Sequence, residues 1–193
     1  LSARPRAILR RLGLIFLLGM AAAMLLGVRL DGVQSALAEK VVRLHVVADS
    51  DAPADQALKL RVRDAVLERA RPWLAGAKDA GEARAALEAH LEELARAGAE
   101  TAAEAGWSGP VTASLEDHVW VPTRTYTDFA LPEGAYPALR VVIGEGEGRN
   151  WWCVIFPPLG MGAVTEDAAV TAAEGGLSER EAALITGGDG GYE

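Results

Sequence analysis

The sequence predicts an α+β fold: a single antiparallel or mixed sheet of about four strands with two helices on one face, preceded by an N-terminal membrane or signal helix. Three observations lead to this prediction. The 193 residues suffice for one ordinary domain with appendages, but not for two well-buried domains. Short runs of alternating apolar residues indicate strands, and two longer segments carry apolar residues at helical spacing. Because an apolar helix stripe needs another layer to cover it, the strands are expected to supply a sheet.

Residues 1–38 have the pattern of a segment that directs export. Four arginines precede the uncharged apolar run 12–28: Arg4, Arg6, Arg10 and Arg11. As a helix this run would span about 26 Å, close to the roughly 30 Å of a bilayer's hydrocarbon core. Positive charge before an apolar run is typical of a signal peptide or signal anchor, which contacts the membrane or the translocon. The small residues of Ala36-Leu37-Ala38 predict cleavage after Ala38, with an uncleaved anchor as the alternative.

The α+β domain is predicted to cover residues 39–159 and to begin with a strand and a helix. In the strand, residues 41–48, the even positions are apolar and face the core, whereas the odd positions, including Arg43 and His45, face away. Capping residues and early acids between 49 and 55 favour a helix start. This helix should run to about Arg71, because the following proline discourages its continuation.

The rest of the domain is predicted to hold one more helix and three more strands. An alanine-rich apolar stripe with glutamates opposite predicts a helix over residues 79–105. The further strands are expected at residues 111–115, 138–144 and 151–156, with a proline-rich connection over 120–137. The glycine-rich run 144–148 favours a hairpin turn over a phosphate loop, because its two glutamates would repel phosphate and a strand follows it.

Residues 160–193 are acidic and rich in glycine and alanine, so we expect a loosely ordered tail whose removal costs little stability.

Charge is unevenly placed along the chain. The first 38 residues hold five basic groups and one acidic group, a net of +4, whereas the 14 basic and 26 acidic groups from Glu39 onward give −12. Such an acidic body is a poor match for nucleic acid.

Few residues offer catalytic chemistry. One cysteine and three histidines exclude a disulfide framework within the chain and argue against a Cys/His zinc site, and we expect no cofactor. His45, Asp49 and Asp51 lie close together at the end of the first strand, where a surface histidine and a helix cap account for them without chemistry. Cys153 stands inside an apolar strand, which indicates a buried structural thiol. The enzyme alternative is an extracytoplasmic hydrolase that uses His45 with Asp49 or Cys153, and it requires these groups to converge in a pocket.

Two blocks of residues resemble the stage II sporulation protein R family. The first block comprises residues 43–51 (RLHVVADSD), 55–60 (DQALKL) and 62–66 (VRDAV). The second comprises LPEG at 131–134, Tyr136, ALRV at 138–141, IGEG at 143–146 and NWWCVIFPPL at 150–159. The resemblance covers residues 41–159, with a weaker middle, and the last run is highly specific.

The resemblance implies an exported signal rather than an enzyme. Members of this family are made in the forespore and exported into the space between the two cells. There they trigger a membrane-embedded aspartic protease of the mother cell, which processes the precursor of sigma factor E. The family often has a second cysteine where this chain has Gly160, so the resemblance implies that a disulfide from Cys153 to that position is not available here.

Alternation within the strands predicts where the partner binds. The face away from the helices should carry Arg43, His45 and Arg140. Both alternating sets of the last strand are apolar, so either Trp151 or Trp152 must face away from the helices as well. Arginine and tryptophan are enriched at binding hot spots, so we expect a partner-binding patch on this face. The alternative is that the tail or the 120–137 connection covers it as an ordinary second layer.

Overall fold

The computed structural model describes residues 12–22, 24, 36–125, 129–158, 175–178, 181 and 185. Two compact units make up the chain, residues 1–36 and residues 37–193. In the first unit, residues 12–22 and residue 24 are helical, as the apolar run predicts. Among the described residues, no helix combines the length and the apolar character needed to cross a membrane. The second unit begins two residues before the predicted domain boundary.

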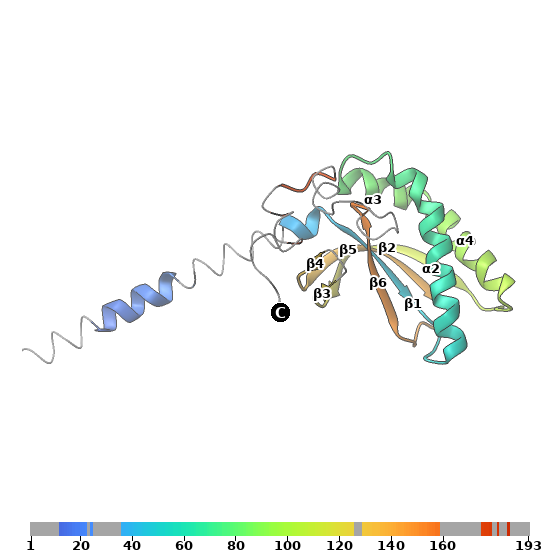
Figure 1. Ribbon diagram of the computed structural model, residues 1–193, viewed down its shortest axis with the longest axis horizontal. Helices are drawn as coiled ribbons and strands as arrows, with labels where there is room; N and C mark the ends of the chain where they lie inside the picture. The colour runs from blue at the N-terminus through green and yellow to red at the C-terminus, as the bar shows by residue number, and fades with distance from the viewer. Residues whose placement is uncertain are drawn as a thin grey trace, which may run out of the picture. The chain divides into compact units, whose positions relative to one another are not determined.

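A four-stranded mixed sheet forms the centre of the second unit, which confirms the predicted fold class (Figure 1). Its strands lie in the order β2-β5-β1-β6. They are β1 (Val42–Val47), β2 (Val111–Val121), β5 (Gly134–Ile143) and β6 (Asn150–Phe156). Strand β1 pairs in parallel with β5 and antiparallel with β6, and β2 pairs antiparallel with β5. Two short strands, β3 (Arg124–Thr125) and β4 (Ala130–Leu131), form a separate ladder.

The order of the strands corrects the prediction of a hairpin at residues 144–148. Strand β1 lies between β5 and β6, so the chain crosses the end of β1 instead of turning back on its neighbour. Strands β2 and β5 are also longer than predicted, and β5 includes Pro137. A β-bulge in β2 between Glu116 and Val119 lies opposite this proline, where a ladder hydrogen bond could not form.

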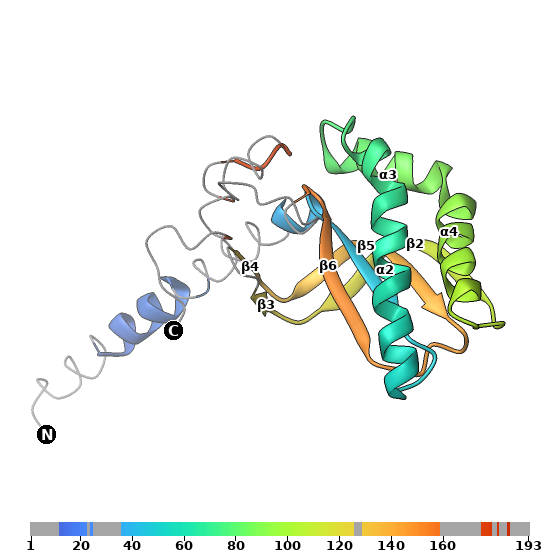
Figure 2. The same ribbon diagram turned by 45° about the vertical axis from the view of Figure 1, so that its right-hand side comes forward.

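Three helices cover one face of the sheet, where two were predicted (Figure 2). They are α2 (Pro53–Leu74), α3 (Ala80–Ala89) and α4 (Leu91–Glu104). The predicted helix 79–105 divides at His90, whose φ of −123° and ψ of 18° leave the helical region. The ring of His90 stacks on Trp73 at 4.0 Å, which fixes the bend against α2. Helix α2 ends at Leu74, three residues beyond the predicted end at Arg71, so Pro72 lies in its last turn and Leu74 is buried in the core.

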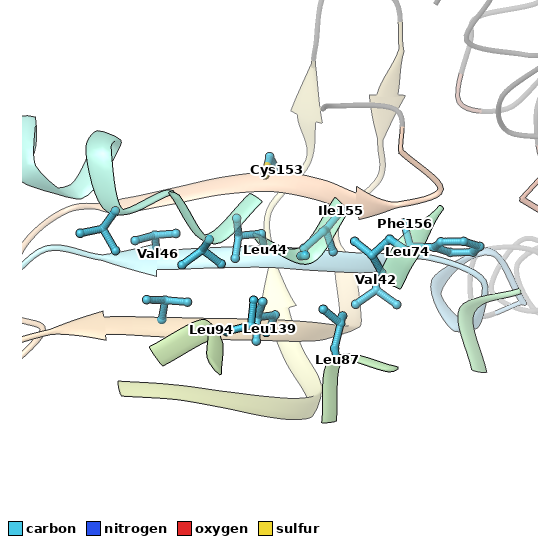
Figure 3. Close-up of a cluster of buried hydrophobic side chains, with 14 of the residues drawn as sticks. Val42, Leu44, Val46, Leu74, Leu87, Leu94, Leu139, Cys153, Ile155 and Phe156 are labelled. Atoms are coloured by element: carbon cyan, nitrogen blue, oxygen red, sulfur yellow. The ribbon is translucent and has the colours of Figure 1, made fainter. Parts of the chain in front are cut away.

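The main core lies between this helix layer and the sheet. Alternate residues of β1, β5 and β6 point toward the helices, including Leu44, Leu139 and Ile155 (Figure 3). Gly98 lets α4 approach closely, because a Cβ atom there would lie 3.0 Å from Val111 Cγ1 and 3.2 Å from Val62 Cγ1. The apolar stripes of the helices and the even positions of β1 are thus buried as the spacing predicts.

A second, smaller core covers part of the opposite face of the sheet. Its buried members come from segments far apart in the sequence: Leu37, Ala38, Val41, Val121, Phe129, Leu131, Tyr136, Val154, Leu177 and Ile185. Residues 36–39 form a helical turn that leads into β1. Both the connection before β5 and the described C-terminal residues therefore supply a partial second layer.

Described residues of the tail include a hydrogen-bonded helix cap. Ser178 and Glu181 form a capping box: the backbone N–H of Ser178 donates to Glu181 Oε2 at 2.7 Å, and the N–H of Glu181 donates to Ser178 Oγ at 3.4 Å. Lys40 Nζ also donates to Glu181 Oε2 at 2.7 Å. The remainder of residues 160–193 lies outside the described residues.

Candidate functional site

One row of side chains crosses the sheet on the face away from the helices. The strand pairing places Ser114 beside Arg140, Arg140 beside His45, and His45 beside Trp152. Leu44 faces the helices, so the next residue along the strand, His45, must face away from them. The residues paired with His45 across the sheet face the same way. The prediction that one tryptophan faces away from the helices is confirmed, and that tryptophan is Trp152.

His45 is the centre of this row. Its ring stacks on Trp152 with the ring centroids 3.7 Å apart and an interplanar angle of 11°. His45 Nε2 lies 2.9 Å from Oδ1 of Asn150. The expectation of a surface histidine is wrong, because His45 is only 7% exposed. Burial lowers the pKa of His45, the hydrogen bond to Asn150 opposes that shift, and the nearby charge of Arg140 adds to it. At neutral pH, His45 therefore presents an uncharged ring held against an indole.

Arg140 supplies the charge in the row. Its Nη1 lies 3.3 Å from Glu116 Oε1, and both side chains are 39% exposed. Ser114 is exposed and Trp152 is half-buried. We call the surface formed by Ser114, Glu116, Arg140 and Trp152, backed by the buried ring of His45, the open face. It combines one arginine, one carboxylate and an aromatic stack beside the second core.

Arg43 lies on the same side of the sheet, but it is not part of the open face. The expectation that Arg43 is a surface residue is wrong, because its side chain is fully buried. Its guanidinium carbon lies 5.1 Å from the centroid of the Tyr136 ring. The hydroxyl of Tyr136 donates in turn to the carbonyl of Pro132 at 2.7 Å. The alternative of a covering second layer therefore holds for this half of the face.

Trp151 lies on the helix side of β6. Its cross-strand partner is Val46, a core residue that faces the helices. The guanidinium carbon of Arg63 on α2 lies 4.5 Å from the centroid of the Trp151 ring, and Trp151 remains 36% exposed. Of the two tryptophans proposed for the patch, only Trp152 thus belongs to the open face.

The carboxylates after β1 hold the loop that crosses the end of this strand. Oδ1 of Asp49 accepts from the backbone N–H of Glu145 at 2.8 Å, and Oδ1 of Asp51 accepts from the N–H of Arg149 at 2.8 Å. Gly144 has a φ of +60°, and a Cβ atom there would lie within 2.0 Å of Asp49 Oδ1. Both carboxylates thus hold the crossing loop. The prediction that they cap the helix is wrong, because Ala52 is the N-cap residue of α2 and no side chain of the described residues caps that end. Within the described part of the chain, no group of three or more potential metal ligands occurs.

The residues of the hydrolase alternative do not converge. Cys153 pairs with Leu44 and faces the helices, on the opposite side of the sheet from His45. The thiol is buried, and burial raises its pKa to about 11. Asp49 lies beyond the strand and binds the crossing loop. The candidate nucleophile, base and acid thus occupy three separate environments.

Sequence reasoning missed Asn150 and Glu116, the partners of His45 and Arg140. They lie 105 and 24 residues from the side chains that they contact. No local pattern signals such pairs, because the register of the strands alone brings them together.

The described residues thus define a mixed-sheet α+β domain in which the candidate functional residues line a sheet face. A family model described as stage II sporulation protein R matches residues 38–166, more than half of the chain. The chain belongs to this family. It is also 35% identical over 121 residues to a curated protein of Bacillus subtilis (strain 168), "Stage II sporulation protein R". That match covers 63% of this chain and 54% of the relative, so the chain spans about half the length of the curated relative. No solved structure matches the chain.

Proposed function

We propose that this protein is an exported sporulation signal that acts by binding. It passes from the forespore into the intermembrane space and contacts a membrane-embedded aspartic protease of the mother cell. The protease then processes the precursor of sigma factor E. Family membership supports the role in sporulation. The arginines before the apolar run 12–28 support export, with the N-terminal helix contacting the membrane or the translocon.

The open face carries the proposal for how the protein binds. The half-buried Trp152 is held rigid by its stack on His45, so little side-chain entropy remains to be lost when a partner covers it. Arg140 adds a charged group whose current partner, Glu116, is itself partly exposed. Tryptophan and arginine are both among the side chains most enriched at binding hot spots. The open face is therefore the proposed docking site for the protease.

No specific observation favours the hydrolase alternative. His45 and Cys153 lie on opposite faces of the sheet, and the Asp49 carboxylate accepts a backbone hydrogen bond from the crossing loop. A mechanism that joins these groups would require the sheet to come apart. Binding, by contrast, uses the open face as it stands.

Two substitutions on the open face test the proposal in a sporulating strain. Arg140→Ala removes the charge, and Ser114→Tyr adds bulk at an exposed position of the same row. We expect each variant to reach the intermembrane space and to retain the native melting temperature. Processing of the sigma factor precursor should fall about tenfold, as expected when a hot spot is lost.

Arg84→Ala is the matched control. Arg84 is 37% exposed and pairs with Asp117, so this variant also removes a half-exposed, ion-paired arginine. Arg84 belongs to α3, in the helix layer, and processing should remain normal. If processing survives both open-face variants, this face is not the docking site. If processing continues when the whole protein is absent, the signalling function itself is refuted.

A further inference from the structure

The segment that resembles a signal-peptide cleavage site is part of the folded body. Ala36-Leu37-Ala38 has the small residues that a signal peptidase selects. Yet Leu37 is fully buried and Ala38 is 8% exposed, both within the second core. Ala36, in contrast, is exposed and is not a buried member of this core. A cut after Ala38 would therefore remove two core side chains from the body, those of Leu37 and Ala38.

Backbone and side-chain bonds fix this segment at the start of β1. The N–H of Lys40 donates to the carbonyl of Leu37 at 3.1 Å, and the N–H of Val41 donates to the carbonyl of Ala38 at 3.4 Å. Lys40 Nζ forms an ion pair with Glu181 at 2.7 Å. The segment is thus joined both to the first strand and to the described C-terminal residues.

A cut after Ala38 would damage these contacts in two ways. It would remove both carbonyl acceptors, those of Leu37 and Ala38, and leave a cavity beside Val41. It would also place a new, positively charged α-amino group on Glu39, next to Lys40, whose ammonium forms the ion pair with Glu181.

We propose that the exported protein is not cut after Ala38, and that residues 36–41 form the N-terminal edge of the folded body. Any proteolytic processing of the chain then lies upstream of Ala36. This inference rests on the proposed export, but it is independent of the open face and of the protease. It assigns a structural role to a segment whose sequence is typical of a processing site.

Ala36 allows a clean test in the full-length chain. Its side chain is exposed, so Ala36→Arg spoils the small residue required three positions before the cut without disturbing the core. Ala36→Ser keeps a small residue and is the matched control. The exported proteins are recovered from sporulating cells with an antibody against the body, and their N-terminal peptides and intact masses are measured.

We expect the native protein and both variants to contain the peptide that spans residues 36–41, with masses that differ only by the substitution. A native protein that begins at Glu39, together with an uncut Ala36→Arg variant, overturns the proposal. If export from the forespore fails, the same chains can be translated in vitro with membrane vesicles that contain signal peptidase. The sizes of the products then show whether the chain is cut after Ala38. In that case the absence of export contradicts the proposed function, and the product sizes still decide whether Ala38 is a cleavage site.

Discussion

Substituting Ile185 tests whether the C-terminal residues belong to the fold. Ile185 is 1% exposed and lies in the second core, although it stands in a segment whose composition suggests disorder. Ile185→Ala removes three carbon atoms, which corresponds to about 2.4 kcal/mol of lost transfer free energy at roughly 0.8 kcal/mol per methylene. A cavity adds to this cost, so we expect a loss of about 3 to 4 kcal/mol in the free energy of unfolding. The composition of the tail predicts the opposite result, namely that the tail can be removed at little cost.

Urea unfolding of the compact unit, followed by tryptophan fluorescence, measures this loss. We expect the melting temperature to fall as well, by roughly 6 to 16 °C for a unit of this size. Leu60→Ala is the control, because Leu60 is 37% exposed on α2 and should cost less than about 1 kcal/mol. If Ile185→Ala unfolds within about 0.5 kcal/mol of the native protein, Ile185 does not pack on the body and the reasoning fails.

Two further predictions concern titratable groups on the two faces of the sheet, His45 of β1 and Cys153 of β6. Burial lowers the pKa of His45 below its ordinary value of 6.5, so the unfolded chain binds a proton that the folded chain does not. The stability contributed by the neutral ring should be complete above about pH 6.5 and should fall as the pH drops below that value. In the His45→Gln variant, the free energy of unfolding should therefore depend less on pH below about pH 6.5. An unchanged pH dependence in this variant would contradict the lowered pKa of His45. On the other face, the pKa of Cys153 near 11 leaves roughly a hundredfold less thiolate at pH 8 than its ordinary value of 9.0, so iodoacetamide should label the native protein far more slowly than the urea-unfolded chain. Equal labelling rates would show that the thiol is accessible.

Local periodicity determined the elements and their faces. The alternation in β1 placed Leu44 toward the helices and His45 away from them, because a period of two is a property of the strand alone. The helical spacing of apolar residues located α2 and the α3–α4 region. The spacing of Ser178 and Glu181 is also a local signal, that of a capping box, whereas the composition of the tail alone predicts a loose segment.

Tertiary structure decided which of those faces remain open. Arg43 and His45 have the same alternation, yet Arg43 lies under the second core while His45 borders the open face. The covering residues come from the connection before β5 and from the C-terminal segment. The residues next to Arg43 in the sequence do not predict that these distant segments pack over it. The insertion of β1 between β5 and β6 is likewise a pairing of distant segments. The direction of a side chain follows from the local geometry of its strand or helix, so the sequence by itself determined it. The exposure of a side chain depends on every distant segment that packs over it, so only the tertiary structure decided it.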